Sequence, residues 1–356
     1  MCRAMKIMLC LGLLVNGFSP VLHSSQAWIE EPCPPRALFS FCVVTERPGT
    51  WIWLDQGWTA LGILVNPWLI EICNPYTGQI INQIHAPRTG VFKGLPAFSP
   101  DGQLLATPVD DGTIRVWEVQ SGRELWTLPS RKEGGSAAFG PDGKLYSLGL
   151  DGEIVVWDVK TGTKFLSLRE FEPCGGAAVI GLSPDGRWLV GLIPWWVDTV
   201  GAVDCRFWAS VVWDMTTGQV ARVFPGWVYF LPDDQLLVLE PCSPLPKAMV
   251  WDGPLGSKPW AMRLPWVQAI LGLSVRSDGQ YIAFGLADGT IRFLNVSTAQ
   301  EVAQLALKTV LGPGAEAHWI SFSPDGNFLL TVWAPEMGKL QVYLWHVGEL
   351  LKRAGP

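Results

Sequence analysis

Few residues in this sequence could carry out a chemical reaction, and none of them stands in a recognisable catalytic motif. The chain has 356 residues but only four histidines. His85 and His346 fall within apolar runs typical of β-strands, which favours structural roles for both. The sequence contains no zinc-protease motif, nucleophile elbow, phosphate-binding glycine loop or calcium-binding loop. We therefore predict no catalytic residue, no metal site and no cofactor, and expect that the protein is not an enzyme.

One short segment, residues 194–208, concentrates side chains that suit binding. It holds two aromatic pairs and a guanidinium group, in Trp195, Trp196, Arg206, Phe207 and Trp208. Such groups are enriched among the residues that dominate the energy of protein interfaces. The same aromatic rings could instead fold inward as a small local core. Both interpretations stay open from the sequence, and the segment is our first candidate binding site.

The elements that must position these residues come from an internal repeat. A turn of the form Ser/Gly-Pro-Asp-Gly recurs at residues 99–102, 140–143, 183–186 and 323–326, and degenerate copies stand at 231–234 and 276–279. The aspartates of successive turns are 41 to 48 residues apart. This spacing is near the period of a four-stranded propeller blade, and it is longer than solenoid periods of about 20 to 35 residues.

One repeat unit contains four short apolar runs that are separated by turn signals. We predict strands at about residues 94–99, 103–109, 113–119 and 123–128. Asp-Gly between two such runs is a strong hairpin signal, because the tight turn needs positive φ angles. Ile114 and Trp117 would point to opposite faces of their strand, so both faces must be covered. A sheet packed between two neighbouring sheets supplies that cover.

Seven such units account for nearly all of the chain after the N-terminal region. We place them at about residues 49–85, 94–128, 135–168, 177–224, 227–264, 269–307 and 317–347. The last unit lacks a fourth strand, and the apolar run 37–44 belongs to no repeat. We therefore predict an all-β, seven-bladed β-propeller of four-stranded antiparallel blades, a single domain over residues 37–351. The N-terminal strand would complete the last blade and close the ring, which removes exposed sheet edges.

These residues resemble WD40 repeats, in the divergent form with many Ser-Pro-Asp-Gly turns that is typical of bacterial proteins. The resemblance rests on the turns and on Trp-Asp pairs that end third strands, at Trp157, Trp213 and Trp251. It implies a rigid platform for protein partners. The Gly-His pair that precedes WD40 blades is absent, so the family's Asp-His-Ser-Trp hydrogen-bond network is not expected. Asp111, which matches the family's turn aspartate, would then only form its turn.

The interruptions of the repeat point to one face of the propeller. Blade four carries the insertion 194–208 between its second and third strands, and blades five and seven carry 240–247 and 333–339 in the same slot. All such loops leave a propeller on one face, the top face, and loops carry binding function. We therefore add two tryptophans in or beside these loops, Trp68 and Trp333, to the candidate binding residues.

The cysteines agree with an ordered top face. The chain has eight of them, scattered without metal-ligand spacing. Two disulfide pairings would fit the predicted loops, Cys174 with Cys205 or Cys205 with Cys242. Closing a loop of about 30 residues contributes roughly 3 to 4 kcal/mol in the chain-entropy model. Three others lie near the predicted ring closure, where they could staple the N-terminal strand: Cys33, Cys42 and Cys73.

Composition and the N-terminus limit the partners and the compartment. The formal net charge is -6, so the basic surface that nucleic-acid binding needs is missing. Residues 1–27 combine basic residues, a short apolar run and a small residue at position 27, as in a cleaved signal peptide. The apolar run is too short to span a bilayer. We expect export to the periplasm, cell envelope or medium, with residues 28–36 as a lead-in, 352–356 as a tail and no transmembrane segment after cleavage.

The function predicted from the sequence is that of a non-catalytic scaffold. We expect the propeller to bind a protein partner, or a peptide or glycan, through its top-face loops. The first alternative is a propeller enzyme of lactonase or glycosidase type, in which carboxylates from several blades meet in the central channel. The second alternative is a scaffold for envelope assembly.

Overall fold

A computed structural model gives the structure of the chain and describes most of the repeat region. The described residues are 37–44, 52–130, 135–148, 153–168, 178–195, 207–240, 247–256, 260–262, 264, 270–306, 316–336 and 339–352. Residues 1–27, the predicted signal peptide, lie outside them. In the described part the regular structure is mainly β-strands joined by turns, with a 3-10 helix η1 (Pro232–Asp234) and a short helix α3 (Val347–Leu351). No described helix has the length and apolarity that crossing a membrane would require.

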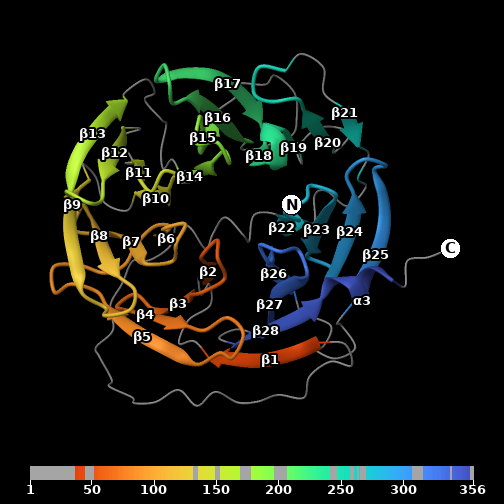
Figure 1. Cartoon of the computed structure of the whole chain (residues 1–356), viewed down its shortest axis with the longest axis horizontal. Coiled ribbons are helices and arrows are strands. Elements are labelled where there is room, and N and C mark those ends of the chain that lie inside the picture. Colours follow the sequence, from red (N-terminus) through yellow and green to blue (C-terminus); the bar gives the residue numbers. More distant parts are fainter. Residues whose placement is uncertain are drawn as a thin grey trace. The chain divides into compact units, whose positions relative to one another are not determined.

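The strands form seven four-stranded antiparallel sheets, the blades of a seven-bladed β-propeller (Figure 1). Blade one contains β2 (Ile52–Leu54), β3 (Leu61–Asn66), β4 (Leu69–Cys73) and β5 (Ile80–His85). Blade two contains β6 (Ala97–Phe98), β7 (Leu104–Val109), β8 (Thr113–Glu118) and β9 (Glu124–Pro129). Blade three contains β10 (Ser136–Phe139), β11 (Leu145–Leu148), β12 (Ile154–Asp158) and β13 (Thr163–Leu168).

The remaining blades follow the same order along the chain. Blade four contains β14 (Ala178–Leu182), β15 (Trp188–Trp195), β16 (Phe207–Asp214) and β17 (Gln219–Pro225). Blade five contains β18 (Trp227–Phe230), β19 (Leu236–Glu240), β20 (Lys247–Trp251) and β21 (Trp260–Met262). Blade six contains β22 (Ile270–Val275), β23 (Tyr281–Leu286), β24 (Thr290–Asn295) and β25 (Gln300–Ala306). Blade seven contains β26 (Glu316–Phe322), β27 (Phe328–Glu336), β28 (Lys339–His346) and β1 (Ala37–Val44).

Blade seven confirms the prediction that the N-terminal strand completes the last sheet. Its strand order is β1-β28-β27-β26, so its outer strand comes from the start of the chain. β1 pairs antiparallel with β28 from Ala37 opposite Trp345 to Val44 opposite Lys339. The pairing supplies β28 with a second hydrogen-bonded neighbour, which its own repeat unit lacks.

The chain divides into two compact units. One contains β1 and the elements from β22 to α3, and the other contains β2 to β21. Within each blade we call the strands a to d in spatial order, so that a–b and c–d turns leave one side, the bottom face. The b–c turns and the connections from strand d to the next blade leave the other side, the top face.

The core lies between neighbouring blades, as the two-sided pattern of the third strands predicts. In β8, Ile114 and Trp117 are both buried although they point to opposite faces. One cluster joins Tyr146 and Ile154 of blade three with Leu189, Trp213 and other apolar residues of blade four. Within each compact unit, neighbouring blades therefore cover each other's faces with apolar side chains.

The Ser-Pro-Asp-Gly turns are held by their own side chains. In blade two, Ser99 Oγ donates to Asp101 Oδ1 at 2.5 Å, and the Gln103 N–H donates to the same oxygen at 3.1 Å. The hydrogen bond from Ser99 is the main reason that the pKa of Asp101 lies below its ordinary value. Gly102 ends the turn with φ of 67°, a conformation that glycine adopts without strain. This explains why the turn recurs with nearly the same four residues.

Candidate functional site

The b–c hairpin of blade four projects farther than that of its neighbour. Strands β15 and β16 have eight residues each, whereas β11 and β12 of blade three have four and five. The ladder continues to Pro194 opposite Trp208 and Trp195 opposite Phe207. The ends of the predicted insertion are thus strand rather than loop, and they extend the top face at blade four.

The structure describes only some of the candidate binding residues of that segment. Trp195, Phe207 and Trp208 lie at the described tip of the hairpin, and their backbones pair across it. Trp196 and Arg206 lie outside the described residues, as do the three cysteines proposed for a disulfide: Cys174, Cys205 and Cys242. Binding through this segment and the disulfide both stay predictions.

Trp68 lies where the sequence places it, in the b–c turn of blade one. Its side chain is 51% exposed, which is uncommon for tryptophan. The Trp68 N–H donates to Asn66 Oδ1 at 2.9 Å, and its carbonyl oxygen accepts from the Ala86 N–H at 2.8 Å. The turn is therefore held from both sides while the indole faces solvent, so Trp68 is available for contact with a partner.

The structure corrects the expectation for Trp333. This residue lies inside β27, opposite Gln341 on β28, and its side chain is 0% exposed. Its indole N–H donates to Thr331 Oγ1 at 2.8 Å. The hairpin of blade seven continues to Glu336 opposite Lys339, so the predicted loop 333–339 is mostly strand. Trp333 belongs to the core of its unit and is not a surface anchor.

Buried tryptophans of the third strands have a partner that the sequence analysis missed. In blade three the indole N–H of Trp157 donates to Ser147 Oγ at 2.9 Å, and in blade two Trp117 donates to Thr107 Oγ1 at 2.8 Å. The hydroxyl lies two residues beyond the residue paired with the tryptophan, as Trp157 opposite Leu145 illustrates. The missing histidine thus leaves the tryptophan-to-hydroxyl half of the WD40 network intact in these blades.

Asp111 does more than form its turn, although its expected histidine partner is missing. Its carboxylate accepts from Thr113 Oγ1 at 2.5 Å, from Thr89 Oγ1 at 2.6 Å and from the Arg115 guanidinium at 2.9 Å. Burial alone would raise the pKa of Asp111, but these hydrogen bonds hold it below its ordinary value. Thr89 and Arg115 therefore fasten the connection between blades one and two to the top of blade two.

Cys73 is a buried free thiol and forms no staple in the structure. Burial, with a smaller effect of the nearby Glu71 carboxylate, raises the pKa of Cys73 to about 12. A thiol that stays protonated at neutral pH is a poor nucleophile, so Cys73 acts as a small core residue.

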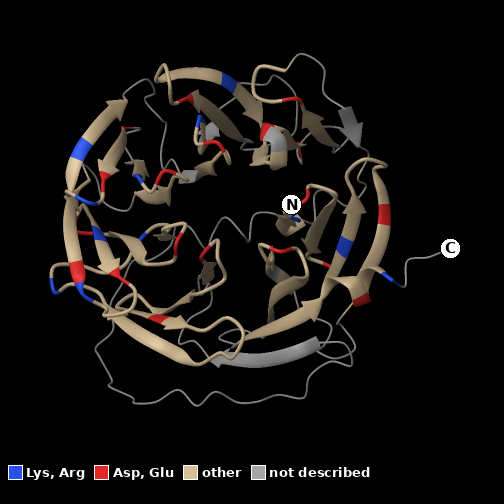
Figure 2. Ribbon diagram, viewed as in Figure 1, with Lys and Arg blue, Asp and Glu red and all other residues tan. Residues whose placement is uncertain are grey.

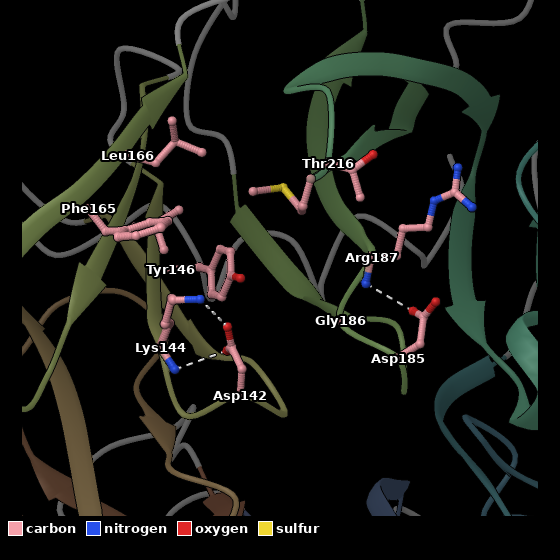
Figure 3. Close-up of a pocket in the computed structure, with 11 residues that line it drawn as sticks. Asp142, Lys144, Tyr146, Phe165, Leu166, Asp185, Gly186, Arg187 and Thr216 are labelled. Carbon is pink, nitrogen blue, oxygen red and sulfur yellow. Dashed lines mark hydrogen bonds and ion pairs between the residues drawn. The ribbon is translucent and has the colours of Figure 1, made fainter.

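A pocket lies on the bottom face, between blades three and four, where the sequence analysis expected none. Its volume is about 280 Å³. The a–b turns of the two blades contribute Asp142, Lys144, Asp185 and Arg187, and Tyr146 and Phe165 add aromatic rings (Figure 3). Pockets for drug-sized ligands hold about 300 to 1,000 Å³, so this one suits a side chain or a short peptide segment.

Charge is mixed along the blades. Figure 2 shows acidic residues at many turns, with basic residues on strands and turns among them, and no continuous basic stretch over the described strands. Over the same residues, no group of three or more His, Cys, Asp or Glu side chains is arranged to hold a metal ion.

A family profile and several known proteins match the repeat region of this chain. A profile of the WD40 family, described as "WD domain, G-beta repeat", matches residues 86–118, which cover the connection from blade one and the first three strands of blade two. Periodic tryptophan protein 2 of Arabidopsis thaliana is 27% identical over 208 residues, which are 55% of this chain and 21% of that protein. The guanine nucleotide-binding protein subunit beta of Oryza sativa subsp. indica is 34% identical over 100 residues, which are 25% of this chain and 26% of that protein.

A solved structure supports the fold. A chain of the hydrazine synthase of Kuenenia stuttgartiensis superposes with a TM-score of 0.58 at 18% identity, over 81% of this chain and 94% of that chain. At this identity the likeness concerns the fold alone. The chain spans about a fifth of the length of the first curated relative and a quarter of the next, so their activities and partners do not transfer with the repeat.

Proposed function

Because the chain belongs to the WD40-repeat family of seven-bladed β-propellers, we propose that it is a protein-interaction platform that acts after export and catalyses no reaction. WD-repeat relatives such as the guanine nucleotide-binding protein subunit beta favour a scaffold role for a propeller of this class. The partner would be a protein that meets the top face. Export is favoured by the basic and apolar order of residues 1–27.

The observation that carries the proposal is the extended hairpin of blade four. Its two strands continue their ladder to Trp195 opposite Phe207, and Trp208 stands one pair below the tip. The hairpin grows from a sheet whose base is packed in the core, and backbone pairing joins its two strands up to the described tip. We propose that the aromatic residues at this tip are displayed to a partner.

Display on paired strands lowers the free-energy cost of binding. Ordering a flexible loop on binding costs free energy, in addition to about 0.5 to 1.5 kcal/mol for each rotamer-rich side chain that a partner immobilises. Backbone pairing fixes the residues at the tip of β15 and β16 before any partner arrives. Tyrosine and tryptophan anchors also lose little side-chain entropy, because they have only two rotatable bonds.

The experiment is an affinity capture from the envelope of the parent cell. The protein is compared with a variant that carries Trp195→Ala, Trp196→Ala and Trp208→Ala. Trp68→Ala serves as a second variant on the same face, and Leu255→Ala as a control that removes an exposed apolar side chain from the bottom face. All variants must first show the same cooperative thermal unfolding as the parent protein.

We expect a partner that the parent protein and Leu255→Ala retain and the blade-four variant loses. A partner that the blade-four variant holds as well as the parent does would move the contact away from this hairpin. If no protein is captured by the parent protein, the platform proposal fails. N-terminal sequencing of the protein from the same cells tests export, and an N-terminus that retains residues 1–27 would contradict it.

A further inference from the structure

We propose that the pocket between blades three and four is a second binding site, which takes a basic side chain of a peptide segment together with an apolar neighbour. Both blades belong to the same compact unit, and the site lies on the bottom face, away from the blade-four hairpin. The proposal does not depend on the proposed top-face contact.

The basic groups of the pocket are already occupied by neighbours. Lys144 Nζ lies 2.6 Å from Asp142 Oδ2 and 4.9 Å from the centre of the Phe165 ring. The Arg187 guanidinium lies 3.1 Å from Asp214 Oδ2 and 4.5 Å from the centre of the Trp188 ring. Each cation thus has a carboxylate and an aromatic face as partners. The pocket has little left with which to attract an acidic ligand.

The groups that remain unsatisfied are hydrogen-bond acceptors. Asp185 Oδ1 accepts from Ser183 Oγ and from the Arg187 N–H, but its second oxygen has no partner among the described residues. Tyr146 is only 5% exposed, and no described residue makes a hydrogen bond with its hydroxyl, which points into the space between the blades (Figure 3). An unpaired tyrosine hydroxyl that faces a pocket is free to make a hydrogen bond with a ligand.

The tyrosine stays neutral, so its oxygen can accept from a cation. Burial, together with the Asp142 carboxylate, raises the pKa of Tyr146 to about 12. A guanidinium group offers five N–H donors that point in different directions from one plane. Tyr146 lies on the blade-three side of the pocket and Asp185 on the blade-four side, so a basic side chain that enters between them would have a hydroxyl on one side and a carboxylate on the other (Figure 3).

The sequence of blade three makes room for this tyrosine. The turn of blade three begins with Gly140, where the turns of blades two, four and seven begin with serine. A Cβ atom at Gly140 would lie 2.9 Å from Tyr146 Cε2, too close for a real contact. The position of Tyr146 is filled by small or aliphatic residues in other blades, such as Ala106 in blade two. Glycine and tyrosine thus depart from the repeat together.

An apolar rim completes the site. Phe165 on the outer strand of blade three is 66% exposed, and Leu166 and Met215 line the pocket beside it. A large exposed aromatic ring next to a flexible methionine suits contact with an aliphatic side chain. The expected ligand is therefore an extended peptide with arginine or lysine next to a leucine-like residue.

The test is a selection from a library of random heptapeptides on the full chain, followed by affinity measurement of the selected peptides by calorimetry. The variants are Asp185→Asn, which keeps the hydrogen bonds of the turn, and Tyr146→Phe. Asp101→Asn is the matched control, because Asp101 has the same role in the turn of blade two and does not line the pocket. The triple alanine variant of the blade-four hairpin is included.

We expect selected peptides that contain a basic residue beside an apolar one. Their affinity should fall about tenfold in Asp185→Asn, since one charge-assisted contact is lost, and about threefold in Tyr146→Phe. Asp101→Asn and the hairpin variant should bind as the parent protein does, which separates this site from the proposed top-face contact. The proposal would be overturned if acidic peptides were enriched or if no peptide were enriched. It would also be overturned if the selected peptides bound Asp185→Asn as tightly as the parent protein.

Discussion

Blades three and four are built from the same repeat, yet their centres are held together in different ways. In blade three the b and c strands are short, and a side-chain hydrogen bond from Trp157 to Ser147 joins them. In blade four the equivalent tryptophan, Trp213, is opposite Leu189, and the residue two positions on is Gly191, which has no hydroxyl. Its strands are instead joined by a longer backbone ladder.

This difference indicates how a repeat can diverge without losing its fold. In blades two and three the tryptophan-to-hydroxyl bond fastens strand c to strand b from within. Blade four lacks this bond and has a long hairpin, whereas blade seven has both the bond and a long hairpin, so the two features vary independently. Blade five has neither feature in full, because Val238 takes the hydroxyl position and the buried indole nitrogen of Trp251 has no partner among the described residues.

The largest effect of breaking this bond is expected in blade seven. Thr331 Oγ1 accepts from both Trp333 and Trp345 at 2.8 Å, so Thr331→Val leaves two buried indole N–H groups without an acceptor. Each unsatisfied buried donor costs about 1 to 3 kcal/mol, which predicts a loss of about 2 to 6 kcal/mol in the free energy of unfolding. Chemical denaturation measures it. A loss below about 0.5 kcal/mol would show that the bonds do not hold the blade.

Blade three offers the single-bond version of the same test. Ser147→Ala removes the acceptor of Trp157 and should lower the free energy of unfolding by about 1 to 3 kcal/mol. Adding Trp157→Phe removes the unsatisfied donor, so the double-mutant cycle should show a coupling between the two residues. Additive effects of the two substitutions would contradict a direct bond between them.

Blade five allows the bond to be restored. Val238→Thr places a hydroxyl at the position that serves the tryptophan in blades two and three, where it can accept from the buried Trp251 N–H. We expect a gain of about 0.5 to 1.5 kcal/mol in the free energy of unfolding. Val238→Ala is the control for altered packing. A destabilised Val238→Thr protein would mean that the hydroxyl does not reach the indole.

The smallest effect concerns the bottom of blade four at low pH. The hydrogen bond from Thr216, followed by that from Arg187, lowers the pKa of Asp214 to about 2. A depressed pKa contributes stability above the ordinary value of 3.8, and this contribution is lost as the pH falls from about 4 towards 2. The difference in unfolding free energy between the parent protein and Asp214→Asn should therefore shrink across that range. A constant difference from pH 7 to pH 2 would contradict the assigned role.

Much of the fold can be predicted from the sequence because its signals are local and repeated. The Asp-Gly turns fix strand ends, so the predicted strands at 103–109 and 113–119 match β7 and β8 to within a residue or two. The last repeat unit lacks a fourth strand, and the apolar run 37–44 belongs to no unit. Together these two features predict that the run pairs with the last unit, as β1 does with β28. The turn signals involve only a few neighbouring residues, and the missing strand is visible as a gap in the repeat pattern.

The sites were harder to predict because they depend on register and on contacts between blades. Trp333 looked like a loop residue, since the proline and glycine that follow it suggest a turn, but the ladder of β27 and β28 runs past it. The pocket between blades three and four joins residues from two turns about 40 residues apart in the sequence. The only local sign of the pocket in the sequence is that Gly140 and Tyr146 both differ from the residues at the same positions of the other repeats.

The central claim, that the hairpin of blade four is the contact surface for a protein partner, is tested most directly by photocrosslinking in the parent cell. A photoreactive amino acid replaces Trp208 near the hairpin tip or, in a second strain, Leu255, an exposed residue of the c–d turn of blade five on the bottom face. We expect a covalent adduct with one protein at position 208 and none with that protein at position 255. An adduct at position 255 alone, or none at position 208, would contradict it.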